Sequence, residues 1–163
     1  MVRTWAPKGE TPILKVPLTR NHYSVISAIS PEGELYLSMQ EKAFDSAAVI
    51  RFLEELLARI PGKLLIIWDG AAVHRSKPLR AFLSQGGAKR IHLERLPGYA
   101  PELNPDEGVW HYLKHVEMGN VCAQDMQDLR EKLQQAYRRL KAKPEIIKAF
   151  FAQAGLSVHE RPT

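Results

Sequence analysis

The chain has 163 residues, a usual length for one domain, and its formal net charge is +5. Hydrophobic residues make up 45% and charged residues 25% of the sequence, a composition that excludes a generally disordered protein. The single cysteine, Cys122, excludes an internal disulfide framework and a zinc site made of cysteines. No apolar run reaches the roughly 18 residues of a membrane-spanning helix, and no signal peptide is recognisable, so a cytoplasmic location without membrane contact is expected.

The N-terminal part of the sequence predicts a β-hairpin followed by a helix. Residues 1–21 contain several prolines, which favours irregular or edge structure. Residues 23–29 and 34–39 alternate between apolar and polar side chains on either side of a Pro-Glu-Gly turn, which is typical of a hairpin. Apolar residues recur at helical spacing over residues 46–60, and Asp45 is placed to cap the first turn, so a helix is expected there.

The middle of the sequence predicts two strands joined by a basic helix. Residues 64–68 form an unbroken apolar run, typical of a strand buried on both faces, and the run ends on Asp69. A short helix over residues 78–84, ended by the glycines at 86–87, separates this strand from a second one at residues 90–96.

Three helices complete the predicted order of elements. After a turn-rich stretch at residues 97–105, helices are expected over residues 105–118, 125–142 and 144–155. The resulting order, ββαβαβααα, combines a hairpin with strands that are joined through a helix. The sequence therefore predicts an α/β protein.

The positive charge is concentrated in one segment. Residues 63–95 contain seven basic and two acidic residues, so this segment alone carries the whole positive excess. Such a patch attracts polyanions such as nucleic acids through the release of counterions. The alternative is a solvated face that keeps the protein soluble, and charge alone favours that alternative.

Two carboxylates are candidates for chemistry, and each has a purely structural alternative. Asp69 follows a strand, where α/β proteins place polar chemistry, but Asp-Gly is also an ordinary turn pair. Glu107 is spaced to close a capping box with Asn104, and local spacing favours that role. A helix N-terminus also keeps a carboxylate such as Glu107 ionised and able to bind a cation. Asp69, from the strand end, and Glu107, from the helix start, could together bind Mg²⁺.

Three histidines are further candidate ligands. His74 could contact a phosphate or a metal-bound group, or it could be an ordinary polar loop residue. His111 and His115 have the i, i+4 spacing of zinc ligands, but no third ligand with clear spacing accompanies them, so zinc is not expected.

Two segments carry a resemblance to a known family. They are WDGAAVHRSKPLRAFL, at residues 68–83, and RLPGYAPELNPDEGVWHYLK, at residues 95–114. Both resemble the catalytic domain of mariner-like bacterial insertion-sequence transposases. The second segment matches the family pattern almost completely, with Ala100 in place of the usual serine. In the first segment His74 matches the pattern, whereas Gly70 stands where asparagine is usual.

The resemblance implies a ribonuclease-H-like fold, in which helices flank a mixed β-sheet, and a DDE active site of three carboxylates. The family's second and final acids map to Asp69 and Glu107, which are 38 positions apart and are the expected catalytic and metal-binding residues. The implied cofactor is Mg²⁺ or Mn²⁺ at a two-ion site, and the implied reaction is DNA strand cleavage and strand transfer in transposition. Contacts to DNA, at the element ends and the target, are expected from His74, Arg75, Lys77, Arg80 and Lys114.

The sequence departs from the family at its N-terminus. In the family, the first acid ends a strand that precedes a segment similar to residues 3–12 of this chain. None of Glu10, Glu41 and Asp45 matches that acid. We therefore expect one DDE endonuclease domain over residues 1–163 that is incomplete at its N-terminus, lacks the first central strand and has no helix-turn-helix domain. Unpaired strand edges favour a homodimer or pairing with an upstream-encoded transposase portion. The alternative is an inactive remnant that only binds DNA or self-associates.

Overall fold

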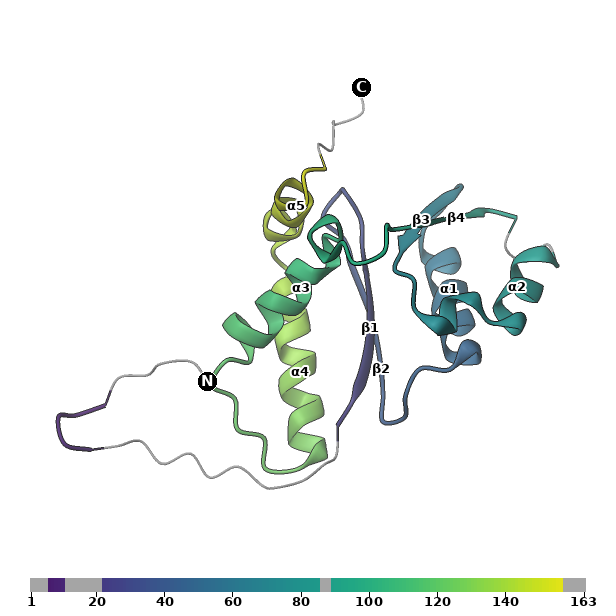
Figure 1. Ribbon diagram of the computed structural model, residues 1–163. Coiled ribbons are helices and arrows are strands. Elements are labelled where there is room, and N and C mark those ends of the chain that lie inside the picture. Colours follow the sequence, from purple (N-terminus) through teal and green to yellow (C-terminus); the bar gives the residue numbers. More distant parts are fainter. Residues whose placement is uncertain (1–5, 11–21, 86–88, 157–163) are drawn as a thin grey trace.

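Residues 6–10, 22–85 and 89–156 are described by the computed structural model (Figure 1). Most of the N-terminal stretch expected to be irregular, and the glycine pair expected to end the basic helix, lie outside the described residues. None of the described helices is both long and apolar enough to cross a membrane. The helices are α1 (Ser46–Arg59), α2 (Lys77–Ser84), α3 (Asp106–Tyr112), α4 (Met126–Lys141) and α5 (Pro144–Gln153), with two 3₁₀ turns, η1 (Ala72–Arg75) and η2 (Pro101–Leu103), and one π-helical turn, η3 (Leu113–Glu117).

The strands of the described residues form two separate pairs. β1 (Ser24–Ile29) pairs antiparallel with β2 (Leu35–Gln40), and this confirms the expected hairpin. β3 (Leu64–Trp68) pairs in parallel with β4 (Ile91–Arg95), through the crossover that contains α2. No hydrogen-bonded ladder joins the two pairs within the described part of the chain. The α/β class is thus confirmed, with both strand directions present.

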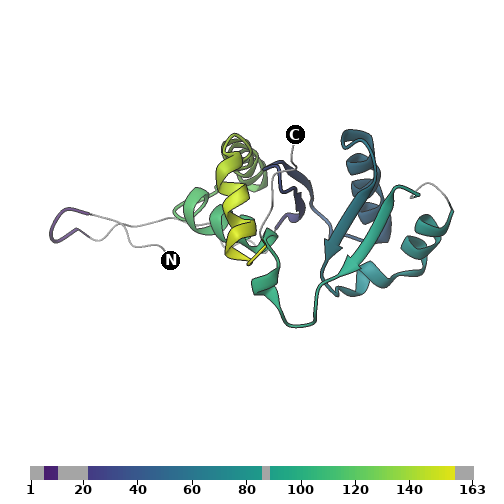
Figure 2. The same cartoon turned by 90° about the horizontal axis from the view of Figure 1, so that it is seen from above.

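The β1–β2 hairpin lies between two groups of helices (Figures 1 and 2). Ile29 and Leu35 pack on one face with residues of α3, α4 and α5. Ile26 and Tyr36 pack on the other face with residues of α1, α2, β3 and β4. Because alternate residues of a strand point to opposite faces, the hairpin contributes side chains to both hydrophobic clusters.

Local signals determine where the longer helices begin. At the start of α1, the Asp45 carboxylate accepts a hydrogen bond from the amide of Ala48 (2.8 Å). At the start of α4, Asp125 accepts one from the amide of Asp128 (2.8 Å). Each bond satisfies an amide that has no partner inside the helix. Helices α1, α2, α4 and α5 lie within two residues of the predicted boundaries and are confirmed.

The expectation that β3 is buried on both faces is wrong. Alternate residues from Leu64 onward pack into the cluster with α1 and α2, but the side chains between them do not. Leu65 is 61% exposed and Ile67 is 52% exposed. The reason is that the described helices cover one face of the β3–β4 pair and leave the other face open. An apolar run indicates a strand, but it does not show whether both faces are covered.

The helix expected over residues 105–118 consists of two parts, α3 and the π-helical turn η3. In this turn the amide of Met118 donates to the carbonyl of Leu113 (2.8 Å), five residues earlier. Glu117, at the end of the turn, accepts a hydrogen bond from Nε of Arg139 in α4 (2.6 Å). Burial alone would raise the pKa of Glu117, but this hydrogen bond and the charge of Arg139 outweigh it and lower the pKa.

Candidate active site

Asp69 follows β3 directly, at the edge where both strands of the parallel pair end. Trp68 lies opposite Arg95, and the amide of Leu96 donates to the Trp68 carbonyl (2.9 Å). Oδ1 of Asp69 accepts a hydrogen bond from the amide of Ala71 (2.9 Å), so the residue forms the turn typical of Asp-Gly. Its side chain is 63% exposed, and Oδ2 has no hydrogen-bond partner among the described residues. The turn therefore uses one oxygen and leaves the other available to a ligand.

His74, in η1, contacts the same oxygen of the Asp69 carboxylate as Ala71 does. Nδ1 of His74 lies 2.9 Å from Oδ1 of Asp69 and 3.2 Å from its backbone carbonyl. The imidazole ring stacks on the indole of Trp68, with the ring centroids 4.2 Å apart and the planes at 4°. With its proton on Nδ1, His74 donates to the carboxylate and restricts its rotation. The structure therefore places His74 beside Asp69, as a residue that can orient it.

Glu107 lies in the first turn of α3 and does not close a capping box in the described part of the chain. Asn104 does act as a cap, because its Oδ1 accepts a hydrogen bond from the amide of Asp106 (3.2 Å). The Glu107 side chain is exposed and forms no hydrogen bond or ion pair with a described residue. Its carboxylate is therefore available to a ligand.

Asp106 is a site residue that sequence reasoning missed. Its Oδ2 accepts hydrogen bonds from Oγ of Ser27 in β1 (2.7 Å) and from Nε1 of Trp110 (3.1 Å). Its Oδ1 is buried and has no partner among the described residues. Burial raises the pKa of Asp106, against the lowering effect of the two hydrogen bonds. These contacts tie the start of α3 to β1 and so fix the position from which Glu107 projects. The i, i+4 spacing of Asp106 and Trp110 is the signal that could have found them.

The expected DNA-contacting cations fall into two regions. Arg75, Lys77 and Arg80 are exposed near the start of α2. Nε and Nη2 of Arg80 donate to the carbonyl of Arg75, at 3.1 and 2.7 Å. Two nitrogens of this guanidinium are therefore engaged within the protein. Lys114 is exposed in η3, on the other side of the hairpin from α2 (Figures 1 and 2). The structure thus groups three of these cations and separates the fourth from them.

The donor chemistry at Asp69 and Glu107 suits magnesium or manganese, which prefer carboxylate oxygens. The described residues nevertheless contain no group of three or more His, Cys, Asp or Glu side chains that could hold a metal ion. The rings of His111 and His115 lie with centroids 4.6 Å apart, and no third ligand joins them in that part of the chain. Asp69 and Glu107 are therefore ligands of the right kind carried by separate elements, after β3 and in α3, and not a full ligand set among the described residues.

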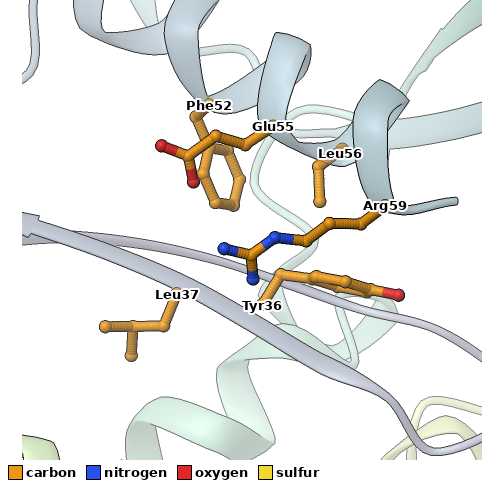
Figure 3. Close-up of a pocket in the computed structure, with 6 residues that line it drawn as sticks. All are labelled: Tyr36, Leu37, Phe52, Glu55, Leu56 and Arg59. Atoms are coloured by element: carbon orange, nitrogen blue, oxygen red, sulfur yellow. The ribbon is translucent and has the colours of Figure 1, made fainter.

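A shallow depression between β2 and α1 contains none of these residues. In Figure 3, Glu55 and Arg59 reach from α1 toward the strand. The depression encloses essentially no space for even a water molecule, whereas small-molecule pockets begin at roughly 300 Å³. The candidate site is therefore the exposed edge after β3, not this depression. The depression is lined by Tyr36, Leu37, Phe52, Glu55, Leu56 and Arg59.

Comparison with known proteins gives one matching family and solved structures of similar fold, two of which are described below. The sequence matches the DDE superfamily endonuclease family over residues 2–130. No curated protein matches the chain. The crystal structure of the Mos1 Strand Transfer Complex is similar with a TM-score of 0.54 and 16% identity, over 94% of this chain and 50% of that chain. The crystal structure of the Mos1 mariner paired end complex with Mn is similar with a TM-score of 0.56 and 16% identity, over 94% and 51%. The chain spans about half the length of these structures, and at this identity the similarity concerns the fold.

Proposed function

The chain belongs to the DDE superfamily endonucleases, and we propose that it forms a transposase catalytic domain, or part of one, that cleaves and transfers DNA strands. Members of this superfamily use divalent metal ions. One observation carries the proposal most directly: the Asp69 carboxylate is held through Oδ1 by Ala71 and His74, and Oδ2 is left exposed. A carboxylate at the end of a parallel strand, with one oxygen held by hydrogen bonds and the other without a partner, is suited to bind a cation beside a phosphate.

Each residue has a separate role in this proposal. Asp69 and Glu107 would hold Mg²⁺ or Mn²⁺, which when bound lowers the pKa of an attacking hydroxyl and stabilises the leaving oxygen. His74 would keep the Asp69 carboxylate in one orientation through Oδ1, which leaves Oδ2 without a hydrogen-bond partner among the described residues. Arg75 and Lys77, both exposed beside this edge, would bind backbone phosphates and position the strand.

Nicking of supercoiled plasmid DNA in Mn²⁺ tests the catalytic proposal. We expect Asp69→Asn and Glu107→Gln each to abolish nicking by the full chain. Glu102→Gln is the matched control, because Glu102 is an exposed glutamate in the preceding η2 turn. The control variant should nick at the rate of the unaltered chain. Equal nicking by all four proteins would mean that the activity does not belong to this site.

A second candidate function is binding of DNA without cleavage, and the incomplete metal-ligand set among the described residues favours it. In that case the chain binds a DNA duplex in a salt-dependent way but does not nick it in Mg²⁺ or Mn²⁺. Replacing Arg75, Lys77 and Arg80 with glutamate should then remove the binding. Nicking that requires both Asp69 and Glu107 would exclude this function.

We also propose that the open strand edges bind another β-strand, from a second copy or from an upstream-encoded transposase portion. Among the described residues, each of the four strands has one edge with no strand pairing, and the face of β3 that carries Leu65 and Ile67 is exposed. Exposed edges of this kind pair readily with a further strand. Light scattering across a range of protein concentrations measures the self-associated fraction, and a strict monomer at all concentrations contradicts the homodimer.

A further inference from the structure

The backbone of Gly70, next to Asp69, is covered by a guanidinium group. A Cβ atom at position 70 would lie 2.9 Å from Nε and 3.0 Å from Cζ of Arg95, and closer still to Nη2. These separations are shorter than the contacts that real Cβ atoms make. Any side chain at position 70 would therefore displace Arg95, and the glycine is what allows the guanidinium to lie against the candidate site.

The strand register explains why Arg95 reaches this position. β3 and β4 run in parallel and end together, with Trp68 opposite Arg95. The arginine therefore leaves the last position of β4 at the level where the chain turns from Trp68 into Asp69 and Gly70. Its long side chain extends across the strand end and lies over the glycine.

The Arg95 guanidinium has no partner in the described part of the chain. Arg95 is exposed and forms no hydrogen bond or ion pair with a described residue. It does not pair even with the carboxylate of Asp69, the residue before Gly70. Oδ1 of Asp69 is instead engaged by Ala71 and His74. A guanidinium with five N–H donors and no bound partner among the described residues thus lies over Gly70, next to a residue whose carboxylate Oδ2 also has no such partner.

We propose that Arg95 binds a phosphate of the DNA backbone at the candidate site, so that this phosphate lies between the guanidinium and the carboxylate of Asp69. This inference rests on the proposed function and adds to it a residue that binds the substrate. An arginine fork matches the two oxygens of a phosphodiester, and it binds them through charge-assisted hydrogen bonds. Gly70 is a positioning residue in this arrangement, because it leaves the space that the guanidinium occupies.

Fluorescence anisotropy of a labelled 20-base-pair duplex with the full chain, in EDTA and over a series of salt concentrations, tests the proposal. We expect Arg95→Gln to weaken binding about three- to tenfold at low salt and to reduce the salt slope by about 0.9, the value for one phosphate contact. Arg51→Gln, at an exposed arginine of α1, removes the same charge and should change the affinity less than about twofold. Equal effects of the two substitutions would overturn the proposal.

Gly70→Ala tests the geometry separately from the charge. The atoms that its Cβ meets belong to the flexible end of Arg95, so the variant should fold while its guanidinium is displaced. We expect it to weaken DNA binding in the presence of Arg95 and to have no further effect in the Arg95→Gln background. Additive losses in the double variant would show that the two residues act independently and would overturn the arrangement.

Calorimetry with Mn²⁺ separates failure of this inference from failure of the proposed function. Asp69→Asn should remove Mn²⁺ binding, whereas Arg95→Gln should retain it. If Mn²⁺ binds through Asp69 but Arg95→Gln and Arg51→Gln bind DNA alike, the role of Arg95 is wrong and the metal site remains. If the unaltered chain binds neither the duplex nor Mn²⁺, both proposals are wrong.

Discussion

Gly108, the residue after Glu107, is a point of close contact between helix α3 and helix α5. A Cβ atom at this position would lie 2.6 Å from both Cγ and Cδ1 of Phe150. Ordinary contacts of a Cβ atom begin at 3.4 Å, so Gly108→Ala requires the ring to move by about 0.8 Å. Phe150 is 7% exposed and packs against Tyr112, with the ring centroids 6.3 Å apart, so little free space receives it. We therefore expect this substitution to destabilise the fold.

The magnitude follows from two opposing effects. Forcing an extra carbon into a packed interior costs about 1–3 kcal/mol in the free energy of unfolding. Replacing a glycine inside a helix with alanine returns roughly 1 kcal/mol. The expected net loss for Gly108→Ala is about 1 kcal/mol, which lowers the melting temperature of a domain of this size by about 2–4 °C.

Urea denaturation and thermal unfolding, followed by far-ultraviolet circular dichroism, measure this loss. Gly98→Ala is the matched control, because no atom lies within 4 Å of a Cβ atom at that position. The control should stay within about 0.5 kcal/mol of the unaltered protein. If Gly108→Ala is as stable as the unaltered chain, or more stable, the reasoning that Phe150 is held against this glycine is refuted.

Three further predictions concern the candidate site and its surroundings. His74→Phe keeps the stacking on Trp68 but loses the contact to Asp69, so calorimetry should show Mn²⁺ binding weakened about tenfold or more, and unchanged affinity would contradict an orienting role. Because burial raises the pKa of Asp106 above its usual 3.8, its contribution to stability is present below that pH and is lost as the pH rises through the raised value. Urea titrations should show this decline in the unaltered chain and not in Asp106→Asn, and identical pH profiles would contradict it. Leu65→Lys, on the open face of β3, should lower the self-associated fraction in sedimentation experiments without lowering the melting temperature, and an unchanged fraction would argue against association through this face.

The parts of the fold that depend on local signals could be predicted from the sequence. The hairpin follows from alternation around a turn, and α1 and α4 follow from apolar periodicity behind Asp45 and Asp125. Asp69 could be found in the same way, because an apolar run that ends on an acid is itself a local pattern. The structure adds that His74 lies against it.

The parts that depend on distant contacts could not be predicted. Asp106 bonds to Ser27, 79 positions earlier in the chain, and no spacing in the sequence connects them. The π-helical turn ends at Glu117, which is held by Arg139 from another helix. The exposure of Leu65 depends on which elements cover β3, and the guanidinium over Gly70 depends on the register of two strands.

The hairpin is the one described unit that packs into both hydrophobic clusters, so each cluster forms a region joined to the other through the hairpin. Among the described residues, the two clusters are linked only through the hairpin. Amides of α3, α4 and α5 can therefore open to solvent together while those of α1 and β3 stay protected. Asp69 belongs to one region and Glu107 to the other. A partial opening of either region would therefore move one carboxylate while the other keeps its place in its own cluster.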